Sequence, residues 1–197
     1  MPKVTDQYRE ARRGEIAAAA LRCFGRKGFQ GTSMADIIAE SGLSAGAIYG
    51  HFTSKDELIE VAVRDTLARL FAEVAAVRSA RPVPEPREVL RMFVNGLSGS
   101  LVDRGLLLQV WAQSTTDATL AHVAAGTVAG LKEVFAGYLT TWFADAGGMS
   151  AMEASSRGKK YAPMMLGVCQ GFIVQSVLIP DFDAEEYLSA LDAISPI

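Results

Sequence analysis

The sequence predicts an all-α protein of about nine helices, because three kinds of signal agree along most of the chain. Apolar residues recur at three- and four-residue spacing, as they do on one face of a helix. Serines and aspartates followed three residues later by Asp or Glu mark helix starts, and Gly or Pro marks helix ends. No run of alternating β-branched residues indicates a strand. With 50% hydrophobic and 21% charged residues, the 197-residue chain also has the composition of a folded protein.

The first part of the chain carries the signals of three helices. Ser33 with Asp36 three residues on has the pattern of a capping box, which predicts the start of a short second helix. Gly42 is placed to end that helix, and Ser44 to cap the next one. The expected helices cover residues 6–25, 33–40 and 44–49.

The remaining residues predict six further helices. Ser150 with Glu153 repeats the capping-box pattern, and Pro86 suits the first turn of a helix after a proline-rich break. The expected helices cover residues 54–78, 87–102, 105–113, 118–144, 150–179 and 183–194.

The segment Gly42-Leu43-Ser44-Ala45-Gly46 matches the G-x-S-x-G pattern of hydrolase nucleophile elbows. An elbow needs a strand before the serine, and an acidic residue and a histidine as its partners. The residues before Ser44 have helical spacing instead. We therefore expect no catalytic residues, and a hydrolase that uses Ser44 is an alternative.

The same segment fits a helix-turn-helix, because two short helices flank its turn and the second begins with hydroxyl and small residues. In this motif the first helix crosses the DNA backbone and the N-terminal end of the second enters the major groove. Ala45 and Gly46 keep the second helix thin enough to approach the bases. The pattern predicts a DNA-binding domain at residues 1–53, followed by a larger helical regulatory domain at residues 54–197.

A composite motif extends over residues 13–58. Its parts are Arg13-x-x-Ile16, Phe24, Gly28-Phe29, Thr32-Ser33, Asp36-Ile37-Ile38, Gly42-Leu43-Ser44-x-Gly46, Tyr49-x-His51-Phe52 and Lys55-x-x-Leu58. In this order they resemble the TetR family of transcriptional regulators, and the resemblance is fainter in the rest of the chain. It implies a dimeric, ligand-responsive repressor and not an enzyme.

The resemblance also implies which residues meet a double-stranded DNA operator. It makes phosphate contacts of Thr32, Ser33, Tyr49, His51 and Lys55, and it places Ser44, Ala45 and Gly46 in the groove. Hydroxyls, a protonatable ring and an ammonium can all donate to phosphate oxygens. Ala45 offers only a methyl group, which suits apolar contact with thymine.

We expect the regulatory domain to bind a small-molecule effector, because aromatic, methionine and amide side chains suit a pocket with apolar walls and a few polar groups. Most such residues in any helical domain are simply core. The pocket candidates are Met92, Phe93, Asn95, Trp111, Gln113, Phe135, Tyr138, Trp142, Met165 and Phe172. We expect no cofactor and no metal, since His51 and His122 belong to no metal-binding motif.

Residues 161–180 carry no charge, have about the length of a bilayer span and contain Gly167-x-x-x-Gly171. A membrane-associated helical protein is therefore the second alternative. Gln170 and Gln175 argue against it, and we favour a helix covered by its own core and by a second copy of the chain, with no membrane partner. The TetR resemblance places a homodimer contact on the last two helices, with Gly167, Gly171, Gln175, Leu178, Tyr187 and Leu191 as candidates.

Charge and cysteine content agree with this interpretation. Up to Lys55 there are eight Lys or Arg against five Asp or Glu, and from residue 56 onward eleven against seventeen. A small basic head on an acidic body can bind DNA, because binding depends on the charge that faces phosphate. Cys23 and Cys169 lie in separate apolar helical settings, so we expect free thiols and a cytoplasmic location.

Overall fold

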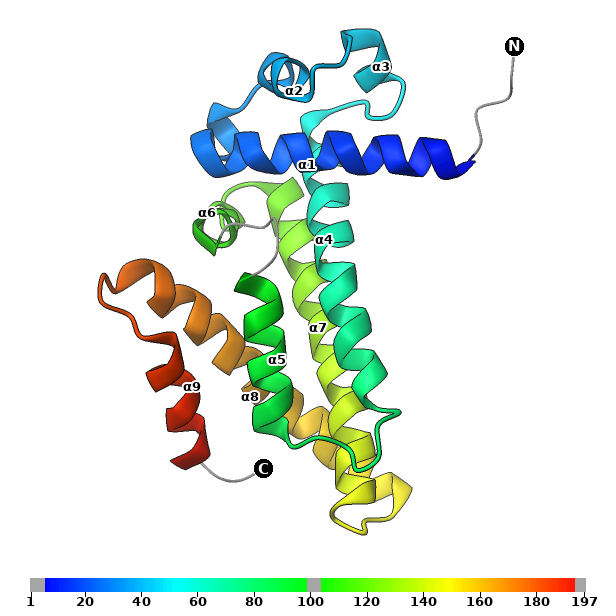
Figure 1. Ribbon diagram of the computed structural model, residues 1–197, viewed down its shortest axis with the longest axis vertical. Coiled ribbons are helices and arrows are strands. Elements are labelled where there is room, and N and C mark those ends of the chain that lie inside the picture. Colours follow the sequence, from blue (N-terminus) through cyan, green and yellow to red (C-terminus); the bar gives the residue numbers. More distant parts are fainter. Residues whose placement is uncertain (1–5, 99–103, 194–197) are drawn as a thin grey trace. The chain divides into compact units, whose positions relative to one another are not determined.

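The structure, a computed structural model, describes residues 6–98 and 104–193. Within these residues the chain forms nine helices and no strand, which confirms the all-α prediction (Figure 1). The helices are α1 (Asp6–Gly31), α2 (Met34–Ser41), α3 (Ala45–Tyr49), α4 (Lys55–Val77), α5 (Pro86–Ser98), α6 (Arg104–Gln113), α7 (Ala118–Asp145), α8 (Ala151–Leu178) and α9 (Ala184–Ala193).

Helix starts lie where the caps predicted them. Ser33 and Asp36 form a reciprocal capping box at the start of α2, and Ser150 and Glu153 form another at the start of α8. Each box satisfies two backbone N–H groups that have no partner inside the helix. Pro86 is the first residue of α5, where its missing N–H costs nothing.

Helix α1 extends to Gly31, beyond its predicted end at residue 25, and it contains a kink. Gly28 has φ 72° and ψ 165°, a backbone conformation that favours glycine. A Cβ at this position would lie 2.9 Å from Oε1 of Gln109 on α6. After the kink the ring of Phe29 is buried against that of Phe24, with the centroids 5.4 Å apart. Gly28 therefore allows the chain to turn Phe29 into the core, and its missing side chain leaves room for Gln109 of α6.

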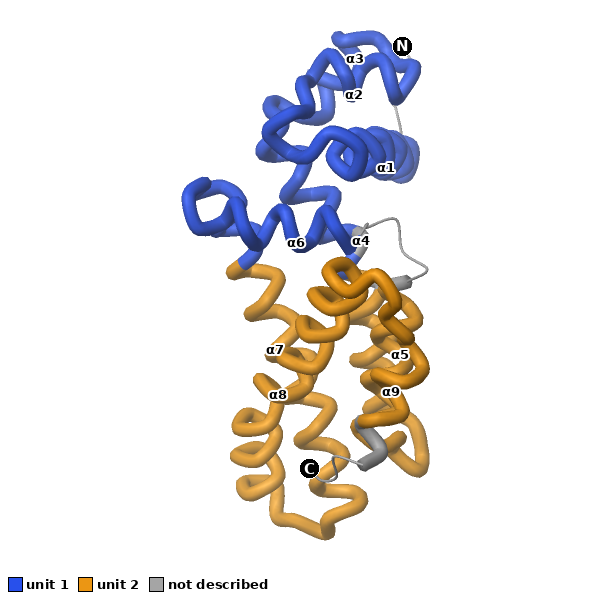
Figure 2. Tube along the Cα trace, turned by 90° about the vertical axis from the view of Figure 1, so that its left-hand side faces the viewer, with its two compact units in different colours: residues 1–67, 101–124 blue, residues 68–100, 125–197 orange. Residues whose placement is uncertain are grey.

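The chain divides into two compact units, shown in Figure 2. Unit 1 comprises residues 1–67 and 101–124, and unit 2 comprises residues 68–100 and 125–197. The division falls inside α4, whereas the sequence prediction places the domain boundary just before that helix. Unit 1 adds α6 and the start of α7 to the predicted DNA-binding region.

Unit 1 has an apolar core between α1, α2, α3 and the start of α4. Ile16, Phe24, Ile37, Ile48 and Phe52 are all fully buried, with 0% exposure. Figure 1 shows α2 and α3 lying along one side of α1. Each short helix is thus held to the core by the buried side chains on one of its faces, Ile37 in α2 and Ile48 in α3.

In unit 2, α5 packs against α8 and α9. Phe172 of α8 is buried together with Val94 of α5 and Leu188 of α9. The Tyr138 hydroxyl of α7 donates a 2.6 Å hydrogen bond to the carbonyl of Pro84, which ties the proline-rich loop to α7. Burial of its side chain raises the pKa of Tyr138 above its ordinary value.

Candidate nucleic-acid interface

A tight turn joins α2 to α3. Gly42 follows α2 with φ 68°, the left-handed conformation common after a helix end. Two residues later, Ser44 begins α3 by accepting a 3.2 Å hydrogen bond from the Ala47 amide. The two helices have 8 and 5 residues, so the turn and their caps set most of their geometry.

Helix α3 has one free face and one buried face. Ser44, Ala45 and Gly46 are exposed, and so is Tyr49, at 51%. A Cβ added at Gly46 would have no neighbour within 4 Å outside its own helix. Ile48 is fully buried. The small exposed residues at the start of α3 would let its backbone come close to another surface.

The surroundings of Ser44 do not fit a nucleophile. Its φ of −69° and ψ of 152° are ordinary extended values, and α2 precedes it in place of a strand. A nucleophile elbow requires a strained turn between a strand and a helix. The Ser44 hydroxyl acts instead as a helix cap.

Thr32 and Ser33, both expected to contact phosphate, differ in exposure. Thr32 is 2% exposed, and its hydroxyl lies 2.7 Å from the Gly28 carbonyl oxygen and 3.2 Å from that of Cys23. This burial argues against a phosphate contact by Thr32, because the hydroxyl bonds to the kinked end of α1. Ser33 is exposed, although its hydroxyl donates to Oδ2 of Asp36 at 2.6 Å.

Lys55 and His51 are both half-buried. Nζ of Lys55 donates a 2.8 Å hydrogen bond to the Phe29 carbonyl and lies 4.3 Å from the centroid of the Phe29 ring. An ammonium has three donors, so this contact leaves others for a phosphate. The His51 carbonyl accepts a 2.5 Å hydrogen bond from Nη1 of Arg13 on α1.

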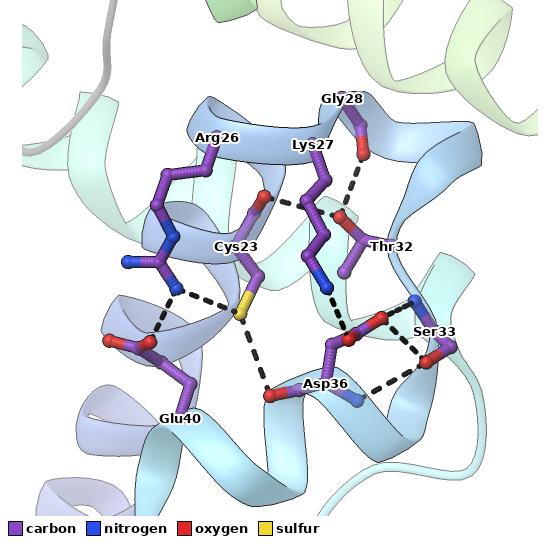
Figure 3. Close-up of polar contacts among 8 residues, drawn as sticks. All are labelled: Cys23, Arg26, Lys27, Gly28, Thr32, Ser33, Asp36 and Glu40. Atoms are coloured by element: carbon purple, nitrogen blue, oxygen red, sulfur yellow. Dashed lines mark hydrogen bonds and ion pairs between the residues drawn. The ribbon is translucent and has the colours of Figure 1, made fainter.

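Three of the six basic residues of α1 are paired with acidic residues of α2, which the sequence did not indicate. Figure 3 shows the pairs made by Arg26 and Lys27. Arg22 and Arg26 both bind the carboxylate of Glu40, and Nζ of Lys27 lies 2.5 Å from Oδ1 of Asp36. The i, i+4 spacing of Asp36 and Glu40 on α2 was visible in the sequence, but nothing indicated that α1 lay opposite them. Part of the basic excess thus holds α1 to α2.

These contacts shift the acidity of both carboxyl groups. The hydrogen bond from Lys27, followed by that from the Ser33 side chain, lowers the pKa of Asp36. Hydrogen bonds from Arg22 and then Arg26 lower the pKa of Glu40. Both groups are therefore negatively charged at neutral pH.

With this geometry established, the comparison with protein families is decisive for residues 16–62, which match the model described as "Bacterial regulatory proteins, tetR family". Over these residues the chain belongs to the TetR family. The predicted helix-turn-helix, α2 and α3, lies wholly inside the matched range.

Individual relatives extend the match. The chain is 33% identical over 124 residues to the regulator BetI of Burkholderia ambifaria, which covers 61% of this chain and 62% of BetI. It is 42% identical over 77 residues to the repressor AcnR of Corynebacterium jeikeium, with 39% and 40% covered. Against an uncharacterised regulator, YfiR of Bacillus subtilis, it is 41% identical over 73 residues, with 35% and 36% covered. The matched stretches thus span between 36% and 62% of these relatives.

Solved structures share the fold over nearly the whole chain. A TetR-family regulator from Syntrophomonas wolfei has a TM-score of 0.73 at 17% identity, with 93% of this chain and 92% of that chain covered. A regulator from Saccharomonospora viridis, solved in complex with choline, has a TM-score of 0.67 at 22% identity, covering 93% and 94%. FadR from Bacillus subtilis, in complex with stearoyl-CoA, has a TM-score of 0.66 at 15% identity, covering 90% and 96%.

The effector-pocket candidates of this TetR-family chain fall into both units. Trp111 and Gln113 lie in unit 1, and the other candidates in unit 2. Asn95 is exposed, which argues against a place in a pocket. Oε1 of Gln113 is buried and has no hydrogen-bond partner among the described residues, so it remains an acceptor for a water or a ligand donor. The buried candidates of unit 2 are Phe93, Phe135, Tyr138, Met165 and Phe172, and Met92 and Trp142 are half-buried.

The dimer candidates differ in what surrounds them. Gly167, Gln175 and Leu178 are exposed, with Leu178 at 67%. Gly171 is covered within its own chain, because a Cβ there would lie 2.9 Å from the hydroxyl oxygen of Tyr187. The side chain of Leu191 lies outside the part of the chain that the structure describes.

Two further expectations concern metals and membranes. Among the described residues, no group of three or more His, Cys, Asp or Glu side chains is arranged to hold a metal ion. Both cysteines are buried and free, and burial raises the pKa of Cys169 to about 12.

In the described part of the chain, α8 alone is long and apolar enough to cross a bilayer, and 33% of its most apolar stretch is buried. A soluble helix with one face left for another chain has the same properties.

Proposed function

We propose that this protein is a transcriptional repressor that binds a pseudo-palindromic operator as a dimer and is released by a small apolar or amphipathic effector. One observation carries the proposal: α3 is held on its buried side by Ile48 and presents Ser44, Ala45 and Gly46 on its exposed side. A helix of this kind after a tight turn is the reading element of a helix-turn-helix.

On DNA, the N-terminal end of α3 would enter the major groove. Ala45 and Gly46 would lie against base edges, with the Ala45 methyl group suited to a thymine methyl. Tyr49 is exposed at 51%, and Ser33, His51 and Lys55 lie near the ends of the short helices, where their donors could reach phosphate oxygens. The Thr32 hydroxyl is not part of this set, because it is buried.

A homodimer would place two α3 helices in successive major grooves, about 34–36 Å apart. The exposed face of α8 supports this partner: Met164, Gly167 and Leu178 lie on one side of the helix, and Met164 and Leu178 are 55% and 67% exposed. Apolar surface of this kind on a soluble protein marks an interface. We place the dimer in the cytoplasm, where both cysteines would stay reduced.

The effector class is proposed from unit 2 and from two structural relatives. The S. viridis regulator was solved with choline, a small quaternary ammonium cation, and FadR with stearoyl-CoA, an amphipathic molecule, so relatives of this fold bind small organic ligands of both kinds. Unit 2 buries the aromatic rings of Phe93 and Phe135 in edge contact, with centroids 5.7 Å apart. Apolar walls with few polar groups suit such a ligand.

Contacts inside unit 1 offer a route from effector to DNA. Gln30 of α1 donates a 3.0 Å hydrogen bond to Asp117, just before α7, and Thr119 of α7 donates to Asp56 of α4 at 3.2 Å. Any movement of the start of α7 would therefore act on the helices around α3. An effector can shift the DNA-binding equilibrium only by its difference in affinity for the two conformations.

The test of DNA recognition is selection of bound sequences from a random pool with the full-length protein. We expect a two-fold related sequence with half-sites one helical turn apart. Recovery of no enriched sequence from a folded dimer, measured at low salt, would contradict the proposal.

The effector is tested by screening acyl-CoA and other amphipathic molecules for thermal stabilisation, with choline included as a small quaternary ammonium cation. A ligand at one hundred times its dissociation constant stabilises a protein by about 2.7 kcal/mol. We expect such a ligand to weaken operator binding in the same concentration range. A ligand that stabilises the protein and leaves operator affinity unchanged would show that the two sites are not coupled.

A further inference from the structure

Arg13 of α1 contacts the segment that follows α3 in three ways. Its Nη1 donates to the carbonyl of His51 at 2.5 Å, and its Cζ lies 4.3 Å from the centroid of the Phe52 ring. Its Nη2 lies 3.7 Å from Oε1 of Glu57. We propose that Arg13 is a positioning residue that fixes α3 against α1 and so sets the sequence specificity of DNA binding. This inference rests on the DNA-binding function proposed above.

Glu57 completes the contact from the other side. Its Oε2 accepts hydrogen bonds from the Thr53 amide at 2.8 Å and from the Thr53 hydroxyl at 2.9 Å. Phe52, fully buried, lies between His51, held by Arg13, and Thr53, held by Glu57. The ion pair between Arg13 and Glu57 therefore closes a bracket around the link from α3 to α4.

Helix α3 needs this bracket because it is short. Five residues make little more than one turn, and a helix of that length has no stability of its own. Ile48 within the helix and Phe52 just after it are buried, which fixes the depth of α3 in the core but leaves rotation about these two side chains open. The planar guanidinium of Arg13 both stacks on a ring and donates in a fixed direction, which a lysine cannot reproduce.

The bracket matters for sequence recognition because the face of α3 that would enter the groove has no long side chain. Ser44, Ala45 and Gly46 can discriminate bases only by close approach. A small displacement of α3 would remove that discrimination. Contacts to phosphate, made by flexible side chains around it, would tolerate the same displacement.

A direct phosphate contact by Arg13 is the competing explanation, and it predicts different behaviour. Removing a phosphate contact weakens binding to all sequences alike. It also lowers the salt slope, the steepness with which the logarithm of affinity falls with the logarithm of salt concentration, by about 0.9 per contact and so by about 1.8 for a dimer. Removing a positioning residue lowers the affinity for the operator but not the affinity for scrambled DNA, and it leaves the salt slope unchanged.

Arg12 provides a matched control. It has the same charge and precedes Arg13 directly, but it donates to Glu15 at 2.5 Å and to the Tyr8 hydroxyl at 2.9 Å, both on α1 itself. Its contacts do not involve the segment after α3. Arg12→Gln therefore reproduces the charge change of Arg13→Gln without removing the bracket.

The first experiment measures binding of full-length Arg13→Lys, Arg13→Gln and Arg12→Gln to the selected operator and to scrambled DNA over a salt series. For both Arg13 variants we expect at least a tenfold loss of operator affinity, with less than a twofold change on scrambled DNA. Arg12→Gln should keep the wild-type ratio of the two affinities. Equal losses on both DNAs, or an Arg13→Lys variant that behaves as wild type, would overturn the proposal.

The second experiment needs no DNA and separates failure of this inference from failure of the proposed function. The amides of His51 and Phe52 both donate to the Ile48 carbonyl at 2.9 Å. In Arg13→Lys we expect these two amides to exchange with solvent at least tenfold faster than in wild type or in Arg12→Gln, while the amides of α8 are unchanged. Unchanged protection of His51 and Phe52 would refute the bracket. Faster exchange in a protein for which no operator can be selected would refute the DNA-binding proposal instead.

Discussion

The hydroxyl of Tyr187 on α9 donates a 2.9 Å hydrogen bond to the carbonyl of Val168 on α8. The Tyr187 ring covers Gly171, where a Cβ would lie 2.9 Å from the hydroxyl oxygen, whereas a Cβ at Gly167 would meet nothing within 4 Å. The two glycines of one sequence motif therefore have different roles. Gly171 allows α9 to dock within the chain, and Gly167 is available to a second copy.

The same substitution at these two positions should separate folding from association. Gly171→Leu should displace Tyr187 and destabilise each chain by about 1–3 kcal/mol through overpacking. Gly167→Leu should leave the chain's own packing intact and weaken the dimer by about 1–3 kcal/mol. Thermal unfolding and light scattering over a dilution series measure the two effects. A Gly167→Leu variant that dimerises as tightly as wild type would place the interface elsewhere.

Ala45 should respond to a longer side chain with a change of preference. Ala45→Gln would bring an amide into the groove, where it pairs best with adenine, so preferences at one or two positions of each half-site should change by about 1–3 kcal/mol. Selection from a random pool with the variant measures this. An unchanged preference in a folded Ala45→Gln dimer would mean that α3 is not the reading helix.

Lys55 should show both a structural and a DNA-binding effect. Lys55→Ala removes the donor to the Phe29 carbonyl, which should cost about 1–3 kcal/mol of stability. If Lys55 also contacts phosphate, the salt slope should fall by about 1.8 for a dimer. Tyr49→Phe is the comparison, because it removes an exposed hydroxyl that has no hydrogen-bond partner among the described residues. A change of salt slope without loss of stability is therefore expected for this variant if Tyr49 contacts phosphate. Loss of stability with an unchanged slope would restrict Lys55 to its structural contact.

Thr32 should affect stability alone. Thr32→Val keeps the shape of the side chain and removes the hydroxyl that bonds to Gly28 and Cys23, at an expected cost of about 1–3 kcal/mol. Well below the melting temperature, operator affinity and its salt slope should match those of wild type. A lower slope for Thr32→Val would restore the phosphate role that burial argues against.

The ion pairs between α1 and α2 predict a loss of stability in acid. Because the pKa of Glu40 is lower in the folded chain than its unfolded value of about 4.3, the carboxylate stabilises the fold above that pH, and the effect is lost as the pH falls through the folded pKa. The difference in melting temperature between wild type and Glu40→Gln should be largest at neutral pH and vanish in strong acid. Glu133→Gln, at an exposed position of α7, is the control. A difference that does not depend on pH would show that the charge of Glu40 is not what holds α1 to α2.

Local features of the helix-turn-helix could be predicted from the sequence because they depend on residues close in the chain. The capping box of Ser33 and Asp36, the left-handed Gly42 and the cap at Ser44 each follow from a few neighbours. The family motif added the role of α3, which the family match supports.

Features that depend on distant residues could not be predicted. Thr32 was expected at phosphate because hydroxyls there can donate, but its direction is set by the kink at Gly28. The partners of Arg22 and Arg26 lie 18 and 14 residues away on another helix, so their charges were counted as part of a basic head. Only the packing of α1 on α2 shows that these charges are already paired.

The composition of unit 1 limits how the protein can be divided by engineering. Gly28 faces Gln109, Gln30 bonds to Asp117, and Asp56 bonds to Thr119, so the helices around α3 share contacts with residues 104–124. A chimera that joined residues 1–67 to the body of another regulator would place foreign side chains against all three. Transplanting residues 104–124 together with the head would keep these pairs matched.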